Sequence, residues 1–560
     1  MRRLAVVLIV LSTVGIFFNC EGDKMEKEFR AFIERKVPQI QSIEKARNLA
    51  YWNATISGKE ELFSKYGELD LQFKKLFSDS AEFDQLKNYK ESGRITEPLL
   101  ARQLELLYNA YLKFQIDSTL LKEITALESA VENKFSVFRG TLDGQPITNN
   151  EILEILKAET DSKKRQKTWE ASKMVGVEIE GDLLKLVRLR NQAAEELGFK
   201  NYYSMSLTLA EQDEAELLRI FDDLKRLTDE PFRKLKAEID AVLAERYGTI
   251  PAMLRPWHYH DPFFQEAPMV LKVDLDKFYA DRDVRELGRT FYDGLGLRVD
   301  SILAHSDLYE KPGKNPHAYC THIDRAGDVR VFTNLKNNVS WMETLLHELG
   351  HAVYDKYMDF DLPYMLREPA HPFTTEAVAM FFGRLARNAY WMRDMLKLSE
   401  EETNQIAVTV NKALRMQQLI FSRWCQVMFR FERELYANPD QDLNKLWWDL
   451  VEEHQLVTRP SNRNAPDWAA KIHFTMAAVY YHNYMLGELM ASQLHAYLAE
   501  NILKQKSDKG ISYVQSTETG SYLRKNIFEP GTRYHWNNLL QHATNESLNP
   551  KYFVMQFVDE

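Results

Sequence analysis

The stretch Leu345-Leu346-His347-Glu348-Leu349-Gly350-His351-Ala352-Val353 places two histidines four residues apart within an apolar run. Residues 341–354 contain no proline and have apolar residues at helical spacing, which predicts an α-helix. Residues four apart lie on one face of a helix, so His347 and His351 can reach the same metal ion. Zinc takes ligands of this type and keeps one position open for water, while Glu348 beside them can serve as a general base. The HExxH pattern therefore predicts a zinc site; the alternative is a buried helix whose histidines make ordinary hydrogen bonds.

A carboxylate would complete the ligand set, and Glu376 is the next acidic residue on a predicted helix. Two prolines mark 368–372 as a loop, after which Thr374 or Thr375 can cap a helix. Two antiparallel helices joined by this loop would bring Glu376 back to the histidines. The other acidic candidates for this position are Asp355, Asp359, Asp361 and Glu368. Of these, Asp355 lies one turn after His351 and is better placed to accept the second ring N–H of a histidine ligand.

The sequences HELGHAVYDKY (347–357) and DLPYMLREPAHPFTTEAVAM (361–380) resemble the angiotensin-converting-enzyme family of zinc peptidyl-dipeptidases. The resemblance implies that His347, His351 and Glu376 bind Zn²⁺ and that Glu348 activates water. Shorter blocks extend it over most of residues 45–558, and they are 50–56, 235–262, 531–540 and 552–553. A weaker similarity, in 313–320 and 480–484, points to the thimet oligopeptidase and oligopeptidase F group.

Two positions depart from the pattern of this family. The family has an Asp one turn after its Glu ligand, where this chain has Met380, so we expect Asp355 or Glu343 to take over that role. The family also has an Arg that binds an activating chloride, where this chain has Asn483. Asn carries no charge, and we therefore expect no chloride site here.

A second group of chemically useful side chains lies in 471–484, although aromatic-rich helices usually belong to the core. The resembling family has Lys-x-His followed by Tyr-x-x-Tyr in this place. By this resemblance His473 and Tyr484 donate hydrogen bonds to the tetrahedral intermediate. Lys471 and Tyr481 hold the C-terminal carboxylate of the substrate, with Tyr480 as the alternative to Tyr481.

Helical patterns dominate the chain, and they cover 97–134, 161–197, 213–246 and 401–437. The stretch 328–333 alternates like a strand, either in a small sheet that binds peptide or in a plain hairpin. Because the candidate site residues are dispersed, we expect one catalytic unit over 24–560. Its fold class would be mainly α, a two-lobed helical ellipsoid with a deep central cleft and a small β-sheet beside the zinc helix.

The first 20 residues have the pattern of a secretion signal. Arg2 and Arg3 precede the uncharged apolar run 4–18, and Cys20 follows where a bacterial lipoprotein would be processed. The alternative is a signal anchor. We expect an exported protein of the periplasm or cell envelope, with contact to the membrane only through a lipid anchor at Cys20. Cys320 and Cys425 allow at most one disulfide, and we expect Cys320 to be a free buried thiol.

The composition excludes one broad class of partner. The net charge of −10 is small for 560 residues. The sequence has no stripe of basic residues of the kind that binds nucleic acid, so we expect no nucleic-acid partner. The sequence therefore predicts a secreted zinc metallopeptidase that acts on oligopeptides and releases C-terminal dipeptides. The alternatives are a zinc oligoendopeptidase that cleaves short peptides internally and a non-catalytic peptide-binding homologue.

Overall fold

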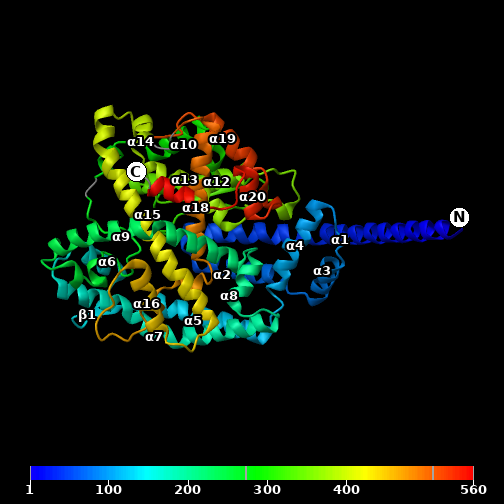
Figure 1. The fold of residues 1–560 in the computed structure, drawn as a ribbon, viewed down its shortest axis with the longest axis horizontal. Helices are drawn as coiled ribbons and strands as arrows, with labels where there is room; N and C mark the ends of the chain where they lie inside the picture. Colours follow the sequence, from blue (N-terminus) through cyan, green and yellow to red (C-terminus); the bar gives the residue numbers. More distant parts are fainter. Residues whose placement is uncertain (1, 272–273, 507–509, 559–560) are drawn as a thin grey trace.

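The computed structural model describes residues 2–271, 274–506 and 510–558, with side chains from Lys24 onward in these ranges (Figure 1). The fold is mainly α, as predicted. The helices of the N-terminal half are α1 Arg2–Ser57, α2 Glu60–Lys75, α3 Ser80–Ser92, α4 Pro98–Leu112, α5 Ser118–Val137, α6 Asn149–Ala158, α7 Ser162–Glu196, α8 Tyr202–Leu209 and α9 Glu214–Arg246.

The C-terminal half continues this helical architecture. Its helices are α10 Val284–Gly294, α11 Asp300–His305, α12 Val339–Lys356, α13 Pro372–Gly383, α14 Ala389–Leu396, α15 Glu400–Ala437, α16 Leu443–Gln455, α17 His473–Met476, α18 His482–Tyr497, α19 Thr517–Leu523, α20 Trp536–Thr544 and α21 Lys551–Phe557. The strands are β1 Gly140–Leu142, β2 Gln145–Ile147, β3 Tyr319–His322 and β4 Val329–Phe332.

Three of the four predicted long helices are confirmed within one residue at each end, as α7, α9 and α15. The helix expected over 97–134 is instead divided into α4 and α5. The side chain of Asp117 accepts the backbone N–H groups of Thr119 and Leu120 and so starts α5 as a new helix. The apolar period continues across the break, which is why the pattern alone indicated one helix.

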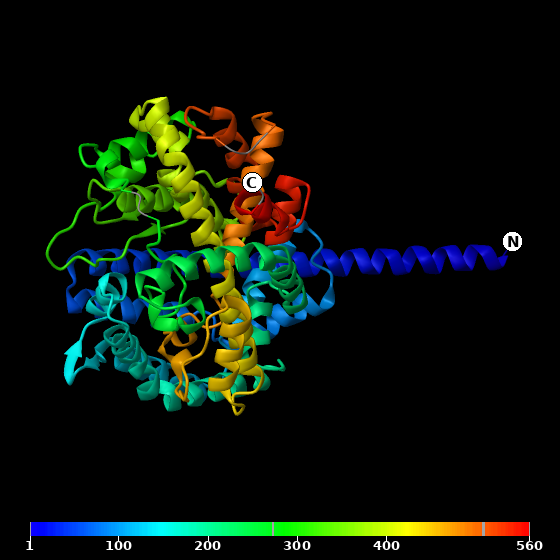
Figure 2. The ribbon, with the colours of Figure 1, turned by 60° about the vertical axis from the view of Figure 1, so that its left-hand side comes forward.

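Helices distant in sequence meet in the main hydrophobic core, which extends from Leu120 to Phe557. It buries the apolar face of α12, where Leu345 and Leu349 lie next to Gly288 of α10, and α12 also packs on α13, which in turn packs on α18. A second cluster joins α1, α3 and α4 and takes in Tyr364 from the loop between α12 and α13. Figures 1 and 2 show most of α5–α9 with α16 on one side and α10, α12–α14, α19 and α20 on the other, with α15 running between them.

The strand predicted over 328–333 is confirmed as β4, which pairs antiparallel with β3 and sets Cys320 opposite Val331. This hairpin packs on α1 through Trp52, which lies edge-on against Phe332. Both β3 and β4 also contact α12. The small sheet expected beside the HExxH helix is therefore present.

The backbone of the predicted leader belongs to α1, whose N-terminal part extends away from the other helices (Figures 1 and 2). The side chains of residues 1–23, Cys20 among them, lie outside the described part of the chain, so leader and lipid anchor stay predictions. Among the side chains that are described, no helix combines the length and apolar character needed to cross a bilayer.

Candidate active site

The HExxH motif lies on α12, where Asn338 caps the helix by accepting the backbone N–H of Trp341. A glycine lets this helix approach α13 closely. A Cβ at Gly350 would lie 2.8 Å from the Cα of Ala379, a separation that real Cβ atoms do not show. The next helix is also close, because a Cβ at Gly487 of α18 would contact Cγ of Glu376 at 3.5 Å. Two glycines thus let three helices converge at the site.

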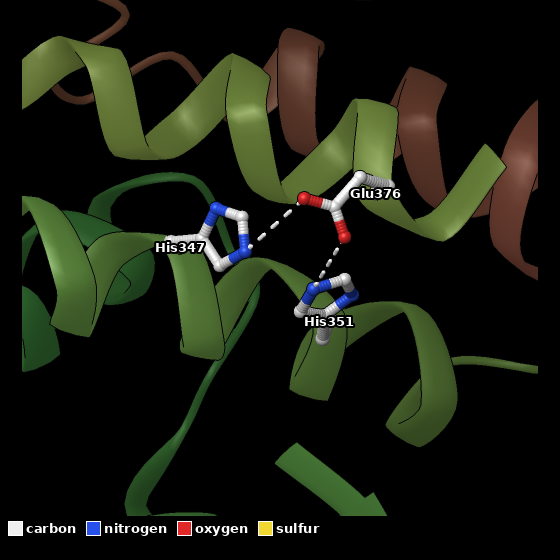
Figure 3. Close-up of side chains that lie close together, drawn as sticks. All are labelled: His347, His351 and Glu376. Carbon is white, nitrogen blue, oxygen red and sulfur yellow. Dashed lines mark ion pairs between the residues drawn. The ribbon is translucent and has the colours of Figure 1, made fainter. Parts of the chain in front are cut away.

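His347, His351 and Glu376 point toward one another across α12 and α13 (Figure 3). Nε2 of His347 lies 3.5 Å from Oε1 of Glu376, and Nε2 of His351 lies 3.5 Å from Oε2 of Glu376. The candidate ligand atoms all lie within 4.8 Å of one another. Tetrahedral zinc with bonds of about 2.0–2.1 Å separates its ligand atoms by roughly 3.3 Å. The three side chains therefore fit a zinc ion with little movement.

The second ring nitrogen of His351 has a partner that the sequence did not suggest. Nδ1 of His351 lies 2.8 Å from Oγ1 of Thr375, the residue before Glu376. With Nε2 turned to a metal, Nδ1–H donates to this hydroxyl and fixes the orientation of the ring. We expected Thr374 or Thr375 to cap α13. Instead the helix begins at Pro372, and His371 caps it by accepting the backbone N–H of Phe373.

Within the described part of the chain, the other acidic residues near the motif do not bond to the candidate ligands. Asp355 was expected to accept from a histidine of the site, but Nδ1 of His351 bonds to Thr375 instead. Burial raises the pKa of Asp355 to about 7, and the charge of the nearby His351 opposes this rise. Glu343 accepts a hydrogen bond from Nε of Arg387 at 2.7 Å. It therefore does not replace the Asp that the family has at the position of Met380. Glu368 forms an ion pair with Arg325 at 2.6 Å.

Glu348 is buried beside the three candidate ligands. Burial raises its pKa to about 7, although the charge of His351 and a backbone N–H of Cys320 oppose the rise. Burial also lowers the pKa of His347 to about 4, which keeps a neutral nitrogen available to a metal. A carboxylate with a pKa near neutrality can both accept and return a proton, as general acid–base catalysis requires.

A cavity of about 650 Å³ opens onto these residues. One wall is β3, from Tyr319 to His322, and another is α1 with Glu44, Arg47 and Asn48. Its lining also includes Tyr480. Cys320 is therefore a free but only half-buried thiol on the cavity wall, rather than the buried thiol expected. Cys425 is free and buried.

The second predicted group clusters next to this cavity. Nζ of Lys471 lies 5.3 Å from the ring centre of Tyr481, and the rings of His473 and Tyr481 are 4.9 Å apart. The ring of Tyr484 lies 5.2 Å from that of Tyr481 and 5.4 Å from that of Tyr480. Lys471 thus has Tyr481, rather than Tyr480, as its neighbour in this cluster.

Electrostatics connect this cluster with the candidate metal site. Burial, followed by the charge of Glu376, raises the pKa values of both Tyr480 and Tyr484, so both hydroxyls stay protonated donors. Burial and the charge of Lys471 lower the pKa of His473 to about 4. Nδ1 of His473 is buried without a hydrogen-bond partner among the described residues. Neutral, protonated donors are what a developing oxyanion requires.

The chain matches the family described as peptidase M2, angiotensin-converting enzyme, over residues 23–558. It belongs to that family. Two curated relatives are more distant. The chain is 23% identical over 415 residues to thermostable carboxypeptidase 1 of Pyrococcus furiosus, covering 69% of this chain and 75% of that protein. It is 24% identical over 139 residues to an inactive angiotensin-converting enzyme-related protein of Caenorhabditis elegans, covering 24% of this chain and 15% of that protein.

Membership of the angiotensin-converting-enzyme family makes this chain a peptidase homologue, and that family is in general zinc-dependent. The chain has a group of two His and one Glu at the cavity that could hold a metal ion. Where the family has Asp, Met380 lies against α18, and its Sδ would be 3.2 Å from a Cβ at Gly487. Where the family has Arg, Asn483 is buried and accepts a hydrogen bond from Nε2 of Gln212 at 2.8 Å.

Sequence reasoning missed two hydrogen bonds made by the predicted carboxylate-binding residues. Nζ of Lys471 donates to Oε1 of Gln265 at 2.7 Å, and Nε1 of Trp424 donates to the hydroxyl of Tyr481 at 2.7 Å. Gln265 precedes Lys471 by 206 residues, so no local pattern could have joined them. Burial lowers the pKa of Lys471 to about 8, although the charge of Asp261 opposes this.

One more group of His and Glu side chains has ligand-like spacing, and it consists of Glu105, Glu211 and His535. Arg102 is already bound there, donating to Glu105 at 2.8 Å and to Glu211 at 2.7 Å. The guanidinium neutralises the carboxylates and repels a second cation. This group is a half-buried ion-pair network that joins Glu105 of α4 to His535, just before α20, and the bound Arg102 argues against a metal there.

Proposed function

We propose that this protein is a zinc peptidyl-dipeptidase, which releases dipeptides from the free C-terminus of oligopeptides. The observation that carries the proposal is the placement of two clusters next to each other. The candidate zinc ligands His347, His351 and Glu376 lie at a cavity whose wall continues, through Tyr480, into the cluster around Lys471. A cationic anchor beside a metal centre is the arrangement that a C-terminal exopeptidase needs.

The donor set suits zinc in its residue types as well as in its geometry, since two imidazoles and one carboxylate leave a fourth position for water. When bound, zinc would polarise the scissile carbonyl and lower the pKa of its water. Glu348 accepts the proton of the attacking water and later returns it to the leaving amine. Its buried position beside the ligands and its pKa of about 7 support both steps.

His473 and Tyr484 supply donors to the oxyanion that forms during attack. The hydroxyl of Tyr484 stays protonated, and neutral His473 has a ring nitrogen that is otherwise without a partner. Donors fixed in place before the reaction are worth about 3 kcal/mol each in comparable enzymes. Tyr480 lines the cavity and is the alternative source of the tyrosine donor.

Lys471 and Tyr481 bind the C-terminal carboxylate. The ammonium group of Lys471 lies among the rings of Phe263, Trp424 and Tyr481, each about 5 Å away, and is held by Gln265. These contacts restrict the side chain before substrate arrives, which reduces the entropy lost on binding. The free edge of β3 along the cavity would pair with the extended backbone of the peptide.

The predicted leader favours a place for this activity outside the cytoplasm. An exported peptidase with a lipid anchor at Cys20 would degrade short peptides in the periplasm or at the cell envelope. The resident ligand is Zn²⁺, and the expected partners are oligopeptides rather than nucleic acid. Cleavage of the leader and labelling of Cys20 by a fatty acid, read by mass spectrometry of the mature N-terminus, test this part.

Three other activities are compatible with the family. The relative named carboxypeptidase suggests release of single residues, and the oligoendopeptidase reading predicts internal cleavage. The relative named inactive suggests the third alternative, a peptide-binding protein without catalysis. Against it, His347, Glu348, His351 and Glu376 are all present in this chain. The zinc-loaded protein incubated with a pool of peptides separates these by product mass: dipeptides, single residues, internal fragments or nothing.

A further inference from the structure

The segment 473–484 carries His473, Tyr480, Tyr481 and Tyr484, so its shape decides whether oxyanion donors and carboxylate anchor are in place together. This segment is irregular between α17 and α18. Val479 within it has φ of +55°. The left-handed region is costly for a β-branched residue and is kept only where the surroundings impose it.

A buried carboxyl group on another helix is hydrogen-bonded to this residue. Glu432 of α15 is 3% exposed, and its Oε1 accepts the backbone N–H of Val479 at 2.7 Å. Burial raises the pKa of Glu432 to about 8, so near neutral pH it is mostly a neutral acceptor. The bond joins the strained residue directly to the longest helix of the C-terminal half.

A buried guanidinium holds the other end of the segment. Arg190 of α7 is 3% exposed and donates to the backbone carbonyls of Phe474 at 3.0 Å and Thr475 at 2.7 Å. The same side chain donates to the hydroxyl of Tyr436, which lies on α15 one turn after Glu432. The segment is thus hydrogen-bonded at both ends of its turn, to Arg190 at residues 474–475 and to Glu432 at Val479.

We infer that Glu432, together with Arg190, is a positioning residue, which holds the strained turn at Val479 so that the tyrosines of 480–484 face the metal centre and Lys471. This inference rests on the proposed function, because it assigns a purpose to the segment that carries the substrate contacts. Neither residue touches the cavity or the predicted reacting atoms.

The test compares variants of the full-length, zinc-loaded protein. Glu432→Gln keeps an oxygen acceptor and should retain kcat/KM within about threefold. Glu432→Leu removes the acceptor, so the strained turn at Val479 can relax, and it should lower kcat by roughly 10- to 100-fold with equal zinc content, the fold-change that corresponds to the strain of one such residue. Glu434→Leu is the matched control, because Glu434 pairs with Arg433 at the surface of the same helix and should behave as wild type.

A second background separates positioning from general support of the core. Glycine adopts φ of +55° without strain, so in Val479→Gly the turn no longer depends on Glu432. Adding Glu432→Leu to Val479→Gly should then cost at least about threefold less in kcat than it costs in the wild type. An equal cost in both backgrounds would show that Glu432 acts through the core, and the inference would be wrong.

Hydrogen exchange gives a readout that does not depend on activity. Glu432→Leu should speed amide exchange in peptides covering 474–484, whereas Glu432→Gln and Glu434→Leu should not. Unchanged exchange there in Glu432→Leu overturns the inference. Failure of the proposed function is seen separately, in the products that the wild-type protein forms, and leaves this exchange result intact.

Discussion

Nδ1 of His351 lies 2.8 Å from Oγ1 of Thr375, so one hydrogen bond links the helix of two candidate zinc ligands to the helix of the third. The bond fixes the ring of His351 and the start of the turn that carries Glu376 at the same time. Polar partners of this kind are worth about 10- to 100-fold in metal affinity in known metalloproteins.

Thr375→Val removes the hydroxyl and keeps the shape of the side chain. We expect it to weaken zinc binding by roughly 10- to 100-fold, measured by competition with a chromophoric chelator. Thr344→Val is the control, because its hydroxyl is exposed on α12 and bonds only to the backbone of Ser340. Equal affinities in both variants would mean that the His351–Thr375 bond does not support the site.

Glu348→Gln should remove peptidase activity and leave zinc in place, since a general base is lost and a ligand is not. We expect a loss of at least about 100-fold in kcat at wild-type zinc content, determined by atomic absorption on the dialysed protein. His351→Ala and Glu376→Ala should lose zinc as well as activity. If Glu348→Gln were also metal-free, the roles assigned to the four residues would be incorrect.

The anchor predicts a characteristic pH dependence. Burial lowers the pKa of Lys471 to about 8, and only the protonated amine attracts a carboxylate. The protonated fraction falls as pH rises through 8, so kcat/KM for peptides with a free C-terminus should decline above that pH. Peptides with an amidated C-terminus should show no such decline, and Lys471→Met should remove it for free peptides. A decline that persists in Lys471→Met would assign it to another group.

The tyrosine donor is decided by two hydroxyl deletions. Tyr484→Phe should lower kcat by roughly 100-fold with little change in KM, because an oxyanion donor acts mainly in the transition state. Tyr480→Phe should have an effect below about threefold if Tyr480 only lines the cavity. The reverse result, read from full kcat and KM values, would give the role to Tyr480.

Chloride should have little effect on activity. Asn483 is buried and neutral, and its carbonyl oxygen is taken by Gln212, whose own carbonyl accepts from His482 at 2.8 Å. This bridge offers no fixed positive charge to an anion. Peptidase rates in sodium chloride and sodium acetate of equal ionic strength should agree, whereas stronger activation by chloride would contradict the assignment.

Local spacing was enough to predict that His347, His351 and Glu376 come together as candidate metal ligands. His347, Glu348 and His351 lie within about one helical turn, which places both histidines on the same face. The two prolines before Glu376 indicate a loop that brings this residue back to them. Contacts between distant segments could not be predicted: the sequence indicates Thr374 or Thr375 only as a helix cap, and no local motif marks Gln265, Trp424 or Glu432. The break between α4 and α5 was missed because its apolar period continues, although Asp117 starts a new helix.

The central claim is that dipeptides leave from a free C-terminus, and mass spectrometry of the products tests it most directly. The zinc-loaded protein is incubated with one oligopeptide as the free acid and as the C-terminal amide. Our account predicts stepwise loss of dipeptides from the acid, and roughly 10- to 100-fold slower cleavage of the amide if the anchor is worth about 1.5–3 kcal/mol. Equal rates on acid and amide, with cuts at internal bonds, would contradict it and favour an oligoendopeptidase.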